Sequence, residues 1–181
     1  MPYILLGVAV LLVLWVIGTY NGLIKLRNLK DEAFATMDVY LKKRYDLVPN
    51  LVETVKGYAS HEKETLQQVV EARSRAMNAG TVEERQAGEN ALTGTLKSLF
   101  ALAENYPDLK ANTGFLDLQR QLQKIEEDIA QSRKYYNAIV KDFNTRIQLF
   151  PISLVAGSLG FSRATYFEIE TGERDNVQVR F

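Results

Sequence analysis

The fold follows from one long segment in the second half of the chain, which reads FLDLQRQLQKIEEDIAQSRKYYNAIVKDFNTRIQLF from Phe115 to Phe150. Its large apolar side chains recur at sevenfold and intermediate positions, namely Phe115, Leu118, Leu122, Ile125, Ile129, Tyr136, Ile139, Phe143 and Phe150. Such a repeat is typical of a helix whose apolar seam packs against other helices. Because one helix cannot bury that seam alone, the pattern predicts an elongated antiparallel helical bundle.

The segments before it supply partner helices. One apolar stripe follows helical spacing through Leu26, Leu29, Ala33, Met37 and Leu41. Proline lacks an N–H and clashes with the preceding turn, so Pro49 predicts that this helix ends near Leu47 or kinks there and resumes at Leu51.

Capping residues delimit two further helices. Ser60 is expected to cap a helix from His61 to about Asn78, which Ala79 and Gly80 close. The run from Thr81 to Glu84 is a capping-box signature that opens the next helix. That helix carries the apolar residues Leu92, Leu96, Leu99, Phe100 and Ala103, and a turn at residues 106–108 ends it.

The N-terminal segment contains no charged residue, because the 44 Lys, Arg, Asp and Glu side chains all follow Ile24. From Ile4 to Ile17 it reads ILLGVAVLLVLWVI, and with its continuation to Ile24 it can cross a hydrocarbon core of roughly 30 Å. A cleaved signal peptide would need a basic leader and a small-x-small cleavage site, so we expect an uncleaved anchor over residues 1–24. Basic residues follow at Lys25, Arg27 and Lys30, and the positive-inside rule therefore places the following domain in the cytoplasm.

Composition excludes several chemistries. The chain has no Cys and one His, so zinc fingers, Fe–S clusters, thiol catalysis and multi-histidine metal centres are excluded. His61 and Glu62 begin a zincin-like pattern, but the second His is replaced by Thr65, and we expect His61 on the surface. Glu126, Glu127 and Asp128 are expected to form a solvated face. We therefore predict a non-enzyme without catalytic, metal or cofactor-binding residues and without a small-molecule substrate, and the zero net charge argues against nucleic acid.

The tail after Pro151 allows two interpretations. It either folds back and completes the bundle core, or it exposes Leu154, Val155, Leu159 and Phe161 as a patch for a partner or the membrane. Weak alternation over residues 166–169 and 177–181 predicts short strands, either as a hairpin about Thr171 and Gly172 or as an edge strand on a neighbouring subunit.

Two other features are candidates for subunit contact. Gly18 and Gly22 form a GxxxG pattern that lets two helix backbones approach, although it is equally compatible with a bend. The stretch DVYLKKRYDLVPNLVETVKGY from Asp38 to Tyr58 allows two interpretations. Either Arg44, Asp38 and Asp46 make ion pairs within or between helices while Tyr40, Leu47 and Leu51 pack in the core, or the stretch is a Tyr- and Arg-rich subunit interface. The full set of candidate contacts is Gly18, Gly22, Tyr40, Lys42, Lys43, Arg44, Tyr45, Leu154, Leu159, Phe161 and Phe181.

The same stretch resembles the LemA family of bacterial membrane-anchored proteins. Further matches are Tyr20-Asn21, Ala59 to Leu66, Ala103 to Asn112, Leu118-Gln119 with Leu122, Tyr136-Asn137, Phe150-Pro151, Ala156-Gly157, Gly160-Phe161 and Tyr166-Phe167. The resemblance implies a short external N-terminus, one transmembrane helix and a helical bundle without a known catalytic site. It also implies a link to a branch of the family that builds intracellular membranes. Phe34 and Phe143 depart from the indole and the tyrosine common at these positions.

Together these patterns predict an all-α, single-pass protein of the bacterial inner membrane. We expect an anchor over residues 1–24, a bundle over residues 25–150 and a tail over residues 151–181. The predicted function is a non-enzymatic scaffold that binds the lipid bilayer, forms homo-oligomers and organises or remodels the membrane. The alternative is an adaptor or regulatory subunit whose partner is a membrane protease or signalling enzyme.

Overall fold

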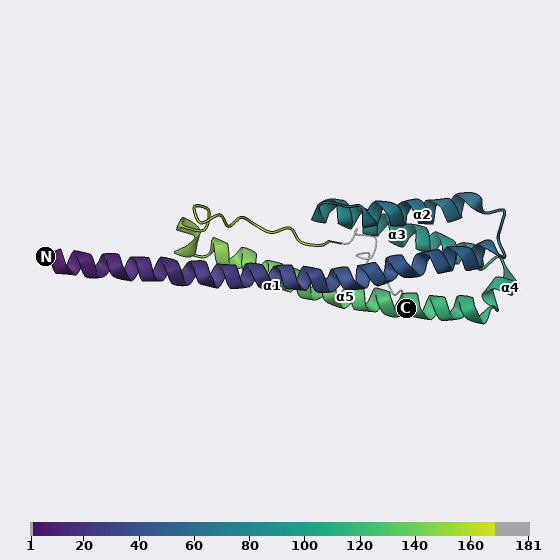
Figure 1. The fold of residues 1–181 in the computed structure, drawn as a ribbon, viewed down its shortest axis with the longest axis horizontal. Coiled ribbons are helices and arrows are strands. Elements are labelled where there is room, and N and C mark those ends of the chain that lie inside the picture. The colour runs from purple at the N-terminus through teal and green to yellow at the C-terminus, as the bar shows by residue number, and fades with distance from the viewer. Residues whose placement is uncertain (1, 169–181) are drawn as a thin grey trace, which may run out of the picture. The chain divides into compact units, whose positions relative to one another are not determined.

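The computed structural model describes residues 2–168 and confirms the all-α prediction (Figure 1). The helices are α1 (Pro2–Lys56), α2 (Lys63–Met77), α3 (Val82–Ala103), α4 (Pro107–Lys110), α5 (Thr113–Gln148) and the 3-10 turn η1 (Ile152–Leu154). Within these residues there is no strand, and residues 161–168 form an extended coil. The hairpin predicted about Thr171 and Gly172 lies outside the described residues.

The apolar N-terminal segment and the first bundle helix are one continuous helix of 55 residues. The prediction that Pro49 could end this helix is wrong, because α1 runs through it to Lys56. Pro49 has no N–H to donate to the carbonyl of Tyr45, four residues earlier. Arg73 of α2 fills that role, since its Nε donates to the Tyr45 carbonyl oxygen at 2.7 Å. A side chain from another helix thus replaces the missing backbone hydrogen bond.

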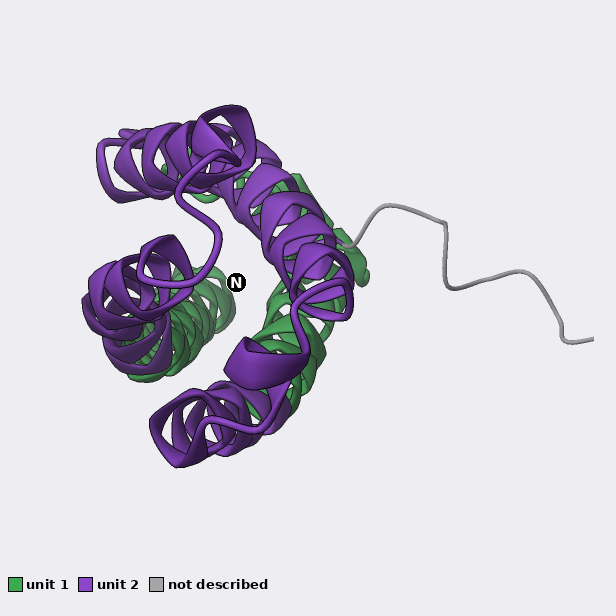
Figure 2. Cartoon of the chain, turned by 90° about the vertical axis from the view of Figure 1, so that its right-hand side faces the viewer, with its two compact units in different colours: residues 1–38, 130–166 green, residues 39–129, 167–181 purple. Residues whose placement is uncertain are grey.

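The chain divides into two compact units, shown in different colours in Figure 2. Unit 1 contains residues 1–38 and 130–166. Here the first part of α1 and the last part of α5 run antiparallel, because Leu23 packs with Phe143 and Ile147 whereas Phe34, further along α1, meets Tyr136 edge to face with ring centroids 5.6 Å apart. This arrangement buries the seam residues Tyr136 and Phe143 of α5.

The tail completes the core of unit 1, as the first of the two interpretations predicted. Ala156 and Phe161 are buried in the same cluster as Leu23, and Gly160 adopts the left-handed φ of 79° that turns the chain back. The buried amide of Asn144 then fixes the coil, since it accepts from the Ala164 N–H at 2.8 Å and donates to the Ala164 carbonyl at 2.9 Å.

Unit 2 contains residues 39–129 and 167–181 and carries the rest of the bundle. Its core is built from buried apolar side chains of helices α1 to α5. They include Leu41, Val48, Leu51 and Val55 of α1, Val69 and Ala76 of α2, Leu92 and Leu99 of α3, Leu109 of α4, and Phe115, Leu122 and Ile129 of α5. Helices α2 and α3 are in close backbone contact at Gly88, where an added Cβ would lie 2.7 Å from the Cα of Ala76. This crossing therefore requires glycine.

The helix ends confirm one capping prediction, contradict another and place the end of the long helix earlier than predicted. Thr81 and Glu84 form the reciprocal capping box of α3. The prediction of Ser60 as a cap is wrong: α2 begins at Lys63 after Glu62, which makes no side-chain cap. The prediction of Phe150 in the seam of the long helix is also wrong, because α5 ends at Gln148 and Phe150 is 80% exposed. The residue before a proline disfavours helical backbone, which favours an end of the helix here.

Candidate functional site

A buried polar group, the Arg44 cluster, lies in unit 2 and joins three helices. The Arg44 side chain of α1 is 2% exposed, and its guanidinium pairs with Glu89 of α3 and, at 2.7 Å, with Glu126 of α5. The Thr93 hydroxyl accepts a third hydrogen bond at 3.2 Å, and the Tyr45 hydroxyl donates to Glu89. The cluster is defined as Arg44, Tyr45, Glu89, Thr93 and Glu126.

The cluster is suited to holding helices in register rather than to acid–base chemistry. Both carboxylates are engaged by Arg44, and Glu89 is buried. Charge-assisted hydrogen bonds from one planar guanidinium fix the positions of their acceptors in direction as well as distance. Within the described residues the Arg44 Nε is buried without a hydrogen-bond partner. The two terminal nitrogens of the guanidinium therefore make all of its contacts with the two carboxylates.

The prediction that Glu126 lies on a solvated face is wrong, because its carboxylate pairs with Arg44 and its side chain is only 38% exposed. The other partner, Glu89, was not predicted from the sequence. A signal for this was present. Glu89 continues the apolar spacing of Leu92 and Leu96, and Arg44 continues that of Met37 and Leu41. Opposite charges on two apolar stripes indicate a buried ion pair.

The basic stretch of α1 is divided between surface and core. Lys42 is exposed and lies 3.9 Å from Asp46, and the Lys43 ammonium lies over the half-buried Tyr40 ring, 5.1 Å from its centroid. Arg44 and Tyr45 are buried instead. The three consecutive cations thus do not form one surface, and Arg44 is engaged within its own chain as the ion-pair interpretation expected, although with Glu89 and Glu126.

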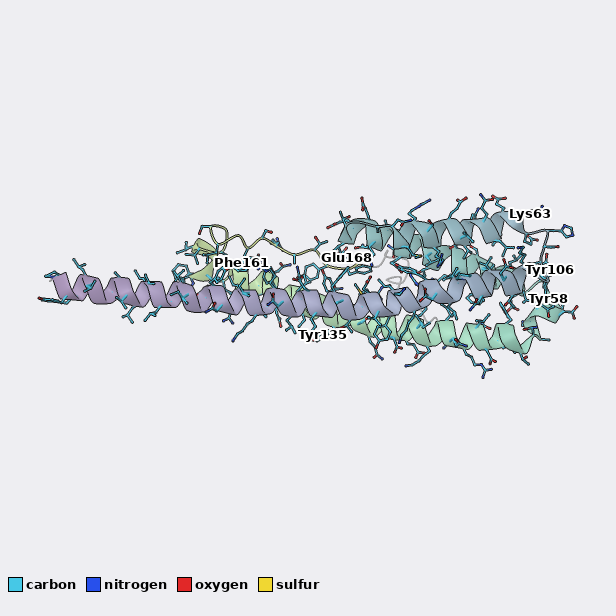
Figure 3. All side chains as sticks on the ribbon, in the orientation of Figure 1. Tyr58, Lys63, Tyr106, Tyr135, Phe161 and Glu168 are labelled. Atoms are coloured by element: carbon cyan, nitrogen blue, oxygen red, sulfur yellow. The ribbon has the colours of Figure 1, made fainter. Side chains whose placement is uncertain are left out.

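The remaining candidate contacts have different environments. Gly18 is exposed and Gly22 half-buried, and a Cβ at either would meet nothing within 4 Å. Leu154 is 72% exposed, whereas Leu159 packs against the core of unit 1. Phe161, labelled in Figure 3, is buried in that core, and Phe181 lies outside the described residues. Their role as subunit contacts stays a prediction.

The N-terminal half of α1 is a candidate membrane span. It is long and apolar enough to cross a bilayer, and none of its most apolar stretch is buried against the rest of the chain. The exposed side chains there include Ile4, Leu5, Leu6, Leu11, Leu12, Val13, Leu14 and Ile17. A contiguous apolar surface of this kind is costly in water and matched in hydrocarbon.

Polar contacts tie the helix connections of unit 2 together at one end, where Figure 3 shows Tyr58, Lys63 and Tyr106 near one another. The Tyr106 hydroxyl donates to Glu62 at 3.2 Å, and the Asn112 amide donates to the Tyr58 hydroxyl at 2.9 Å. Desolvation raises the pKa of the Tyr106 phenol above 10.0, and the hydrogen bond and negative charge of Glu62 raise it further. The phenol therefore stays a neutral donor near neutral pH.

The contact between Arg73 and the Tyr45 carbonyl gives a testable prediction. Replacing Arg73 with Met removes this charged donor from the carbonyl, and we expect the free energy of unfolding to fall by about 1.5–3 kcal/mol. Urea unfolding followed by circular dichroism in a mild detergent measures it. Pro49→Ala is the matched background, because an alanine N–H can bond the carbonyl directly. There the cost of Arg73→Met should fall by more than half, and an unchanged cost would contradict the replacement role.

The model of the LemA family matches residues 33–181. A Protein LemA of Metamycoplasma hominis is 27% identical over 165 residues, which cover 89% of this chain and 74% of that protein. Magnetosome protein MamQ 1 of Paramagnetospirillum magneticum is 24% identical over 175 residues, and Magnetosome protein MamQ of Magnetospirillum gryphiswaldense is 23% identical over 174. The matches cover 82% of this chain but 64% of each magnetosome protein.

Proposed function

Because this chain belongs to the LemA family, we propose that it is a non-enzymatic, membrane-anchored helical scaffold that assembles with copies of itself and organises the bacterial membrane. The observation that carries the proposal is the continuity of α1. One helix contains both the exposed apolar span and the side chains that build unit 2. When copies assemble, several such anchors held side by side gain membrane affinity through multivalency.

Two further observations support self-assembly and an organising role. Unit 2 leaves Lys42, Lys43 and half-buried Tyr40 on the outer face of α1, beside a rigid buried cluster. Tyrosine and basic side chains on a pre-organised helix are favoured anchors of protein contacts. The relatives named as magnetosome proteins support the organising role, since the family resemblance implies a branch that builds intracellular membranes.

The mass of the full-length protein in a mild detergent, measured by light scattering with correction for the detergent, tests this function. A closed homo-oligomer visible by electron microscopy supports the scaffold. A clean monomer or dimer contradicts it and favours the adaptor function, in which the bundle is presented to a membrane protease or signalling enzyme.

A charge-reversal variant tests where the copies touch. Lys42→Glu with Lys43→Glu should reduce the assembly to small species, because it reverses two exposed charges on the proposed contact without touching the core. Arg44 must stay intact, since its replacement would disturb unit 2 itself. Lys124→Glu with Lys134→Glu on α5 is the matched control, and equal disruption by both pairs would remove the α1 face as the specific contact. Gly18→Ile with Gly22→Ile examines the GxxxG contact in the same assay.

A further inference from the structure

A small basic pocket lies in unit 1, and the functions considered so far do not use it. It has a volume of about 140 Å³ and is lined by Arg27 and Lys30 of α1, Phe143 of α5 and the tail residues Gly160, Phe161, Ser162, Arg163 and Ala164. These lining residues carry three positive charges and no carboxylate. The sign of the charge selects an anion as the ligand.

The donors of this pocket are available for a ligand. In the part of the chain that the structure describes, the Arg163 guanidinium and the Ser162 hydroxyl make no hydrogen bond or ion pair. The Arg27 guanidinium lies over the Phe161 ring, 5.6 Å from its centroid, which orients the cation without neutralising it. Lys30 pairs with the exposed Asp31 at 3.1 Å. A planar guanidinium beside a hydroxyl matches the oxygens of a phosphate group.

The pocket also lies at the depth of lipid headgroups. Arg27 and Lys30 follow Ile24, the last residue of the uncharged segment, by about 4.5 and 9 Å of helix rise. The headgroup layer on one side of a bilayer is roughly 5–8 Å thick. When the anchor spans the membrane, the mouth of the pocket therefore meets phosphates.

The turn after α5 supports the same depth. Ile147 packs on Leu23, and α5 runs antiparallel to α1, so the chain beyond Ile147 continues toward the anchor (Figure 1). The turn there exposes Leu149, Phe150 and Leu154 by 54%, 80% and 72%. Large apolar side chains exposed beside a membrane span are accommodated in the interface, just below the headgroups.

We propose that this pocket binds the phosphate of an anionic phospholipid headgroup, with Arg163, Ser162 and Arg27 as its main donors. The inference rests on the membrane anchoring in the proposed function but not on self-assembly. The tail then does more than complete the core of unit 1. It carries Ser162 and Arg163 to α1, and together with Arg27 and Lys30 they select which lipid lies against the anchor.

Trp15 is a built-in reporter of this lipid. It is the single tryptophan of the chain and lies about 14 Å before Ile24 along α1, near the bilayer centre. Acyl chains of a lipid held at the pocket pass beside this part of the helix, and brominated acyl chains quench tryptophan on contact. Full-length protein in phosphatidylcholine vesicles is compared with brominated phosphatidylglycerol or brominated phosphatidylcholine at equal mole fraction. We expect stronger quenching by the anionic lipid.

Arg163→Gln should weaken the preference for the anionic lipid about fivefold, since one basic residue near the surface contributes about that much. Arg163 is exposed, so the variant should keep its fold, which its circular dichroism checks. Lys25→Gln is the matched control: it removes one charge at nearly the same depth but does not line the pocket. Equal losses in both variants would show diffuse surface attraction and overturn the pocket.

Three other outcomes separate the alternatives. Abolition of the preference by millimolar inorganic phosphate would assign the pocket to a soluble phosphate and overturn the lipid proposal. Equal quenching by both brominated lipids would overturn it while leaving the anchor intact. Absence of quenching by either lipid would overturn the anchoring and the lipid site together. The oligomer mass, measured separately, tests only self-assembly.

Discussion

Replacing Arg44 with methionine is expected to lower the free energy of unfolding by about 3–5 kcal/mol, the largest stability effect in unit 2. The substitution keeps most of the side-chain volume but leaves the buried Glu89 without its cation. Without its cation, the buried carboxylate is destabilised by its full desolvation free energy. The hydrogen bond from the Tyr45 hydroxyl alone does not offset this loss. Urea unfolding in detergent, followed by circular dichroism, measures the loss.

Two variants separate charge from packing in this cluster. Lys43→Met removes the neighbouring but exposed cation, and we expect less than about 0.5 kcal/mol. Arg44→Met combined with Glu89→Leu removes both charges and should recover most of the stability, because apolar side chains of similar size replace buried ion pairs well. A double variant as unstable as Arg44→Met alone would contradict the ion-pair explanation.

Replacing Phe161 with alanine is the second large effect and acts on unit 1. The ring is 6% exposed and contacts Tyr20 with centroids 5.8 Å apart and Phe143 with centroids 6.3 Å apart. Its removal from such a core costs about 3–5 kcal/mol. Because Phe161 is the largest side chain that the tail places in this core, beside Ala156, Leu159 and Ala164, we expect the tail to detach while α1 and α5 stay helical.

Hydrogen exchange at the Ala164 amide reports this detachment, since that N–H donates to Asn144 in the docked tail. Its protection should fall by a hundredfold or more, as about 3 kcal/mol of local stability implies. Leu154→Ala is the matched control in the same tail, because that side chain is 72% exposed and should leave the amide protected. Retained protection in the Phe161 variant would mean that the tail is held by its hydrogen bonds rather than by the ring.

Much of unit 2 was readable from residue type and spacing. The seam residues Phe115, Leu122 and Ile129 are buried as predicted, and the capping box of α3 forms at Thr81 and Glu84. Both signals are local, because helical periodicity and end capping act within a few residues of the chain. The Arg44 partners escaped prediction because Glu89 and Glu126 lie 45 and 82 residues away in sequence.

The sequence by itself determined the helical class, the apolar anchor segment and the family of this protein. These follow from the order of apolar and charged residues along the chain, which needs no knowledge of long-range contacts. Only the tertiary structure decided that α1 passes through Pro49, that Arg44 is buried and that the tail brings Arg163 to Arg27. In each case a side chain distant in sequence decided the outcome. A carbonyl without its usual backbone donor, a buried charge and an apolar ring are each stabilised only by a partner that folding brings to them.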